Sequence, residues 1–264
     1  MVMPSNTPPR DLRDLQKHFS DTYFSLRTGL ALLAFAIPFV LYLYGKFRHG
    51  LDLQPSMSAY FWAAAGGQCA TFPMRTIFVG FLCATGVCLY VYKGLTPLEN
   101  YLLNAAAICA ALVAIYPERI TKDEALTNER VAQLFTDCPA IGEWAALPPK
   151  FVHFTAAAIL FVILAIVAWF CAGKSLEFLP AGHDPAKFQR AYKIIAIAMI
   201  LFPIPGIAVA YLFGEPSAKV FFIEAAGILT FGVYWAVKSR ELALSRLEEA
   251  PAEALENAAQ RQGR

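Results

Sequence analysis

The sequence predicts an all-α fold, a polytopic membrane helix bundle with six transmembrane helices and both termini in the cytoplasm. Of its 264 residues, 58% are hydrophobic and 16% are charged, and the mean hydropathy is +0.49. The apolar residues fall in long runs, as is typical of membrane proteins. A run of about 18 or more residues can cross the hydrocarbon core as a helix, because a helix satisfies its own backbone hydrogen bonds.

Six runs qualify, and together they define a transmembrane domain over residues 28–238. The helices are expected at residues 28–44, 76–92, 101–116, 151–171, 191–213 and 220–237. Lys and Arg are more frequent on the side of the bundle that carries the two termini. The positive-inside rule therefore places both termini in the cytoplasm.

The N-terminal segment, residues 1–27, is expected to be cytoplasmic. Apolar residues recur at helical spacing between Leu12 and Leu26, with charged residues between them. This pattern fits an interfacial helix on the inner leaflet or, equally, a helix packed under the bundle. The first apolar run ends in Tyr42, Tyr44 and Lys46 without a small-residue cleavage site, so no removable signal peptide is expected.

Two outer loops are predicted, at residues 45–74 and 117–150. The first is too apolar for a free linker and too polar for a buried span, which predicts a structured cap or a partly re-entrant segment. Each loop holds one cysteine, Cys69 in the first and Cys138 in the second, on the same oxidising side of the membrane. We expect a disulfide between them, with two free thiols as the alternative.

Local signals place further features along the chain. Thr96-Pro97-Leu98-Glu99 fits a capping box with proline at the first helical position, which gives Glu99 a structural role. Pro203 and the pair at 205–206 predict a kink in the outer half of the fifth span. The tail, residues 239–264, is rich in Ala and Glu and is expected to be a solvated cytoplasmic appendage.

The predicted topology gathers ionisable residues at the outer end of the bundle. Glu224 lies inside the sixth apolar run, where a charged group costs about 3 kcal/mol, so it should face the interior, a partner or a wet cavity. Arg75 begins the second span, Glu118 follows the third and His153 begins the fourth. Spans from different parts of the chain thus bring polar groups to one layer.

Two interpretations of this layer remain open. In the first it is a polar ligand pocket with the loop residues Ser56, Ser58 and Tyr60 folded over it. Arg75 would then hold an anionic headgroup, or His153 and Glu224 would transfer protons. In the second it is a buried ion pair between Arg75 and Glu224, with His153 anchoring its helix at the interface.

Catalytic residues are not defined by these patterns, although three candidates stand out. Ser58, or Ser56, could act as a nucleophile with His153 and Glu224 as its partners. A zinc site would need three or more ligands, which can be assembled from His49, His153, Glu118 and Glu224 only by assuming the fold. No metal and no cofactor are predicted.

Several motifs in order resemble an uncharacterised family of bacterial six-span integral membrane proteins. They are Ser56-x-Ser58-Ala59-Tyr60, Met74-Arg75, Tyr92-Lys93-Gly94, Val152-His153-Phe154, Arg190-x-Tyr192, Phe222-x-Glu224 and Phe231-Gly232-x-x-Trp235-x-x-Lys238. The resemblance implies the fold and a multi-pass location in the bacterial inner (cytoplasmic) membrane, but no reaction. Among the polar residues it singles out Ser58, Tyr60, Arg75, His153 and Glu224.

A looser similarity and one departure qualify this resemblance. The serine-containing loop that leads to an Arg-started second span is similar to the Frag1/DRAM group, which is associated with lipid remodelling and autophagy. Residues 61–73 are longer than the family pattern and contain no histidine. A histidine-based metal or acid-base role in this loop is therefore not expected.

Three functions follow as hypotheses. The first is binding or processing of a lipid or amphiphile with an anionic headgroup, and the alternatives are a proton-linked transporter or channel and a non-catalytic accessory subunit of a membrane complex. Membrane lipids are the expected partners, with a further membrane protein or a second copy as an alternative. Nucleic acid is not expected, because the net charge is only +2 and no Gly-rich phosphate loop is present.

Overall fold

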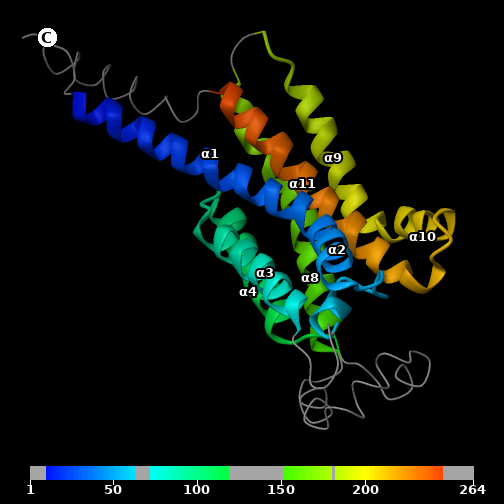
Figure 1. Ribbon diagram of the computed structural model, residues 1–264. Helices are drawn as coiled ribbons and strands as arrows, with labels where there is room; N and C mark the ends of the chain where they lie inside the picture. Colours follow the sequence, from blue (N-terminus) through cyan, green and yellow to red (C-terminus); the bar gives the residue numbers. More distant parts are fainter. Residues whose placement is uncertain (1–9, 64–71, 119–150, 180–181, 246–264) are drawn as a thin grey trace, which may run out of the picture.

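The chain forms long helices packed side by side, as Figure 1 shows for the computed structural model. The structure describes residues 10–63, 72–118, 151–179 and 182–245, and all regular secondary structure in these ranges is helical. Five of the helical segments are long and apolar enough to cross a membrane, and a sixth is added if one bent pair of helices counts as one span. The predicted all-α polytopic bundle is therefore confirmed.

The beginning of α1 and the end of α11 lie at the same end of the bundle (Figure 1). We call this the inner end and the opposite end the outer end. α1 (Arg10–Phe39) continues through a π-helical turn, η1 (Val40–Tyr44), into α2 (Gly45–His49). Residues 10–27 are thus the beginning of α1, which continues without a break into the candidate span that starts at His18.

α3 (Pro73–Val91) and α4 (Pro97–Ile115) form a close antiparallel pair. A Cβ atom on Gly86 would lie 3.2 Å from the Ala107 carbonyl oxygen, so the two backbones approach closely. The predicted capping box is present at the start of α4. Thr96 Oγ1 accepts from the Glu99 backbone N–H at 3.2 Å, and Glu99 Oε2 accepts from Leu95 N–H at 3.0 Å.

The fourth span is α8 (Val152–Ile166), followed by the π turn η3 (Val167–Cys171) and the 3-10 segment η4 (Ala172–Phe178). α9 (Pro185–Leu201) and α10 (Pro203–Leu212) are bent by 65° relative to each other. This bend confirms the predicted kink. It arises because Pro203 has no N–H to continue the hydrogen bonds of the preceding helix.

η5 (Pro216–Ala218) leads into the final helix, α11 (Lys219–Ser245). Two groups of helices result: α1 and α10 pack along α11, while α4 packs between α3 and α8. α9 contacts both α8 and α11 and joins the groups, and α1 also contacts α3. α8 and α11 make little direct contact, so the space between the two groups is not filled by helix packing alone.

Candidate functional site

The first outer loop is docked on the start of α11. Phe221 N–H donates to the Pro55 carbonyl at 3.0 Å, and Met57 N–H donates to Glu224 Oε2 at 2.6 Å. The first N–H groups of a helix have no partner inside the helix. The Pro55 carbonyl therefore provides an acceptor for one of them, and the Glu224 carboxylate provides an acceptor for a backbone N–H of the loop. In the described part of this loop, residues 51–63, most side chains from Ser56 to Trp62 are buried, as expected of a structured cap.

Three predicted site residues, Ser56, Ser58 and Glu118, form one hydrogen-bonded group. Ser58 Oγ donates to Glu118 Oε2 at 2.7 Å, and Ser56 Oγ donates to the same oxygen. Trp62 Nε1 donates to the Glu118 backbone carbonyl at 2.8 Å. Hydrogen bonds to a carboxylate are stronger than neutral ones, so this group ties the loop to the chain that leaves α4.

His153 provides a hydrogen-bond donor for a backbone carbonyl at the end of α4. Its ring is only 3% exposed, and Nδ1 lies 2.8 Å from the carbonyl oxygen of Tyr116, the C-cap residue of α4. The last carbonyls of a helix have no partner inside it, and the nearby Pro117 has no N–H to offer. Because a carbonyl only accepts, Nδ1 carries the proton in this contact, and Nε2 is an acceptor when the ring is neutral.

The arrangement that a serine nucleophile needs is not assembled here. The hydroxyl groups of Ser56 and Ser58 donate to a carboxylate, while His153 donates to a backbone carbonyl. A nucleophilic serine would instead donate to the imidazole, which takes its proton. The catalytic candidates Ser58, His153 and Glu224 thus have separate partners.

Arg75 is held by aromatic rings. Its guanidinium carbon lies 4.4 Å from the ring centroid of Phe61, 5.2 Å from Trp62 and 4.2 Å from Phe72. Nε donates to the Phe61 carbonyl at 3.2 Å. Within the described ranges Arg75 has no acidic partner, so the interpretation of a buried pair between Arg75 and Glu224 is wrong. Cation–π contacts and one carbonyl occupy the guanidinium instead.

Tyr60 is part of the packing under the loop. Its side chain is fully buried in the 3-10 turn η2 (Ser58–Phe61), with its ring centroid 6.1 Å from that of Phe221. Burial raises the pKa of Tyr60 to about 12, so the phenol is neutral under ordinary conditions. Its role in this arrangement is to fill the outer core.

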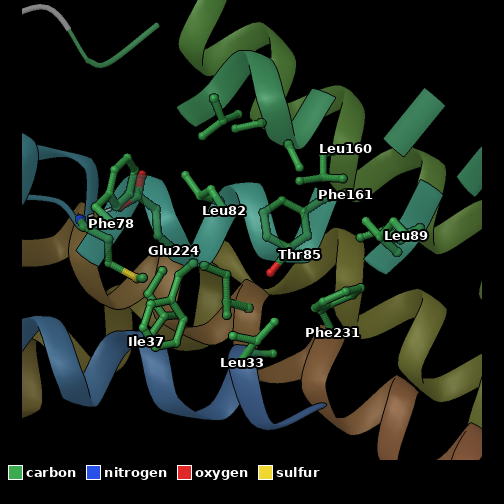
Figure 2. A pocket seen from close by; sticks show the side chains of 18 of the residues that line it. Leu33, Ile37, Phe78, Leu82, Thr85, Leu89, Leu160, Phe161, Glu224 and Phe231 are labelled. Carbon is green, nitrogen blue, oxygen red and sulfur yellow. Dashed lines mark hydrogen bonds between the residues drawn. The ribbon is translucent and has the colours of Figure 1, made fainter. Parts of the chain in front are cut away.

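A cavity that is partly open to the surroundings lies between the two helix groups. Among the described residues that line it, three have polar side chains, namely Thr85, His153 and Glu224, and the others are apolar. In Figure 2, Glu224 lies toward one end of the cavity, and Leu89 and Phe231 lie toward the other. Of the seven predicted binding residues, only His153 and Glu224 line it, whereas Ser56, Ser58, Tyr60, Arg75 and Glu118 do not.

An aromatic layer closes the inner end of the cavity. The Phe231 ring, which lines the cavity, lies 6.2 Å from the ring of Trp235. Trp235 also packs edge-on against Tyr92 at 4.9 Å and against Tyr234 at 5.3 Å. Since Tyr92, Tyr234 and Trp235 are all buried, these rings separate the cavity from the inner end of the bundle.

Beyond this layer lies a polar cluster that the sequence analysis missed. Lys238 Nζ lies 3.1 Å from Glu241 Oε2 and donates to the Ala172 carbonyl at 3.0 Å and to Ser175 Oγ. Ser175 and Tyr192 donate to the same Glu241 oxygen at 2.8 and 3.0 Å. Lys238 is 2% exposed and Glu241 is fully buried.

A sequence signal for this cluster did exist. Tyr234, Lys238 and Glu241 are spaced four and three residues apart, so they share one face of α11. The predicted boundary divides this face, because it assigns Tyr234 to the span and Glu241 to a solvated tail. The helix continues to Ser245.

Other predictions have different outcomes. Cys69 and Cys138 lie outside the described residues. Within the described ranges, no group of three or more His, Cys, Asp or Glu side chains could hold a metal ion. Comparison of the chain with protein-family models, with curated proteins and with solved structures finds no match.

Proposed function

We propose that this integral membrane protein binds a lipid or a similar amphiphile, with its chain in the cavity and its head at Glu224 and His153. The observation that carries the proposal is the division of the cavity lining. One end offers a carboxylate and an imidazole, and the remainder is apolar apart from Thr85. Ligand pockets that are mostly apolar with a few placed polar groups suit molecules divided in the same way.

The energetics favour recognition through the head. A chain that moves from the bilayer into this cavity exchanges one apolar environment for another, so the hydrophobic effect contributes little. Selectivity must then come from the packing of the chain against the lining and from hydrogen bonds at the polar end. The expectation of an anionic head relied on Arg75, which is engaged by Phe61, Trp62 and Phe72 outside the cavity.

The proposal can be tested with a photoreactive single-chain amphiphile in nanodiscs. Leu82 lines the cavity on α3, and Val87 on the same helix is 62% exposed. The variant Leu82→Trp fills the cavity and should reduce photolabelling by about tenfold, whereas Val87→Trp should leave it unchanged. Labelled peptides should come from the lining segments of α3, α8 and α11. Labelling that is equal in both variants would contradict the proposal.

The alternative of a proton-linked transporter is motivated by the bend between α9 and α10 and by Glu224. It requires a path from the cavity to the inner end. The packed rings of Phe231, Trp235 and Tyr92 block that route in this arrangement. Amphiphile binding needs no such path and is therefore the preferred function. The accessory-subunit alternative is favoured by none of the described features.

A further inference from the structure

We infer that the amphiphile held in this cavity carries a primary ammonium head, which Glu224 receives. The inference rests on the proposed function and names the chemical class of its ligand. It begins from the charge at the polar end. Glu224 is an acidic side chain that borders the cavity, and no Lys or Arg is among the described residues that line it.

Two buried or half-buried cations of the described bundle, Arg75 and Lys238, are already engaged elsewhere. Arg75 is stacked against three aromatic rings, and Lys238 pairs with Glu241 beyond the aromatic layer. Within the described residues the Glu224 carboxylate has the backbone N–H groups of Met57 and Ser58 as partners, and no counter-ion. A carboxylate beside an apolar cavity is costly unless a cation or a proton compensates it.

The hydrogen-bonding character of this end is that of an acceptor. The ionised Glu224 accepts through its carboxylate, and the neutral His153 ring with its Nδ1–H used by Tyr116 would offer Nε2 as a second acceptor. A phosphate or carboxylate head offers more acceptors and a like charge, so it finds no donor from either group. A primary ammonium offers three donors and the opposite charge.

An aromatic ring completes the match. Phe78 also lines the cavity, and Figure 2 shows its ring beside the Glu224 side chain. The face of an aromatic ring attracts an ammonium group. A carboxylate, an acceptor nitrogen and an aromatic ring at the polar end of an otherwise apolar cavity together suit an alkyl ammonium group, and they do not suit an anion.

The test compares four amphiphiles with one chain and different heads: primary ammonium, trimethylammonium, alcohol and phosphate. Each competes with the photoreactive probe for the whole protein in nanodiscs of uncharged lipid. The primary ammonium should compete best, about tenfold to a hundredfold better than the alcohol, as expected of a charge-assisted hydrogen bond. The trimethylammonium should rank between them because it keeps the charge but has no donor.

Variants separate the head from the chain. Glu224→Gln keeps an acceptor for Met57 N–H and removes the charge, so the primary ammonium should fall to the affinity of the alcohol, which itself should not change. The matched control is Glu215→Gln, an exposed residue between α10 and α11, which should keep the wild-type ranking.

Each contrary result has a distinct meaning. Equal affinity of all four heads for the wild-type protein, or tightest binding of the phosphate, would overturn the ammonium inference and leave amphiphile binding intact. An ammonium preference that persists in Glu224→Gln would also overturn it. Failure of every amphiphile to compete would instead reject the proposed function. The wild-type ranking decides the matter even if the Glu224 variant does not fold.

Discussion

Lys238 and Glu241 are a buried ion pair whose hydrogen-bond partners come from two further segments of the fold. Ala172 and Ser175 are in η4, and Tyr192 is in α9. Removing a pair of buried charges together is often tolerated, but removing one leaves the other unpaired in a medium of low dielectric. Tyr192 and Ser175 would remain hydrogen-bonded to a carboxylate that has lost its cation.

We therefore predict that Lys238→Met destabilises the protein by about 3–5 kcal/mol. The double variant Lys238→Met/Glu241→Leu should be less destabilised than Lys238→Met alone. Unfolding in a fixed detergent, followed by loss of helical circular dichroism against temperature, measures both. Additive losses in the double variant would show that the two side chains do not act as a pair.

At the scale of elements, the position of α10 depends on one glycine. A Cβ atom at Gly206 would lie 2.5 Å from Ile223 Cα and 2.7 Å from its nitrogen, so α10 lies directly on the backbone of α11. These are backbone atoms and cannot move aside as the end of a side chain can. The bend after Leu201 brings α10 to this contact, and Gly206 permits the approach.

Gly206→Ala is expected to push α10 away from α11 and to lower the melting temperature. The matched control is Gly29→Ala in α1, where a Cβ would meet nothing within 4 Å. Alanine is the better helix former by about 1 kcal/mol, so the control should be as stable as the wild type or slightly more so. Thermal unfolding of the two variants side by side measures the difference, and equal melting temperatures would refute the close-packing argument.

At the scale of the whole molecule, the positions of the spans along the chain were predictable because they depend on local sequence. Long apolar runs require helices in a bilayer, and Pro203 locates the bend. Glu224 and His153 were identifiable because ionisable residues are rare in such runs. Their places in the cavity lining agree with the predicted outer layer.

The partners of these residues were not predictable, because they depend on segments that meet only in the fold. Arg75 stacks on Phe61 and Trp62, so its environment is set by the path of the preceding loop. Glu241 is buried by η4 and α9, which lie far from it in the sequence. A charged residue near a chain end resembles a solvated one until its neighbours are known.

The orientation of the bundle gives a prediction at this scale. His183, between η4 and α9, and Lys46, on α2, are exposed at opposite ends. In a variant without native cysteines, His183→Cys should react with an impermeant maleimide only from the cytoplasmic side, and Lys46→Cys only from the other side. Sealed vesicles of known orientation measure the labelling. The reverse pattern would invert the topology assigned from the distribution of Lys and Arg.

For the proposed amphiphile, the aromatic layer at the inner end of the cavity would act as a molecular ruler. Along α11, Glu224 and Phe231 are separated by about 10 Å, at about 1.5 Å per residue. A head fixed at Glu224 therefore leaves a set length for its tail before the tail meets the rings of Phe231 and Trp235. Longer tails would have to fold back on themselves or leave a portion among the bilayer lipids, so under the proposed function this layer would sort ligands by chain length.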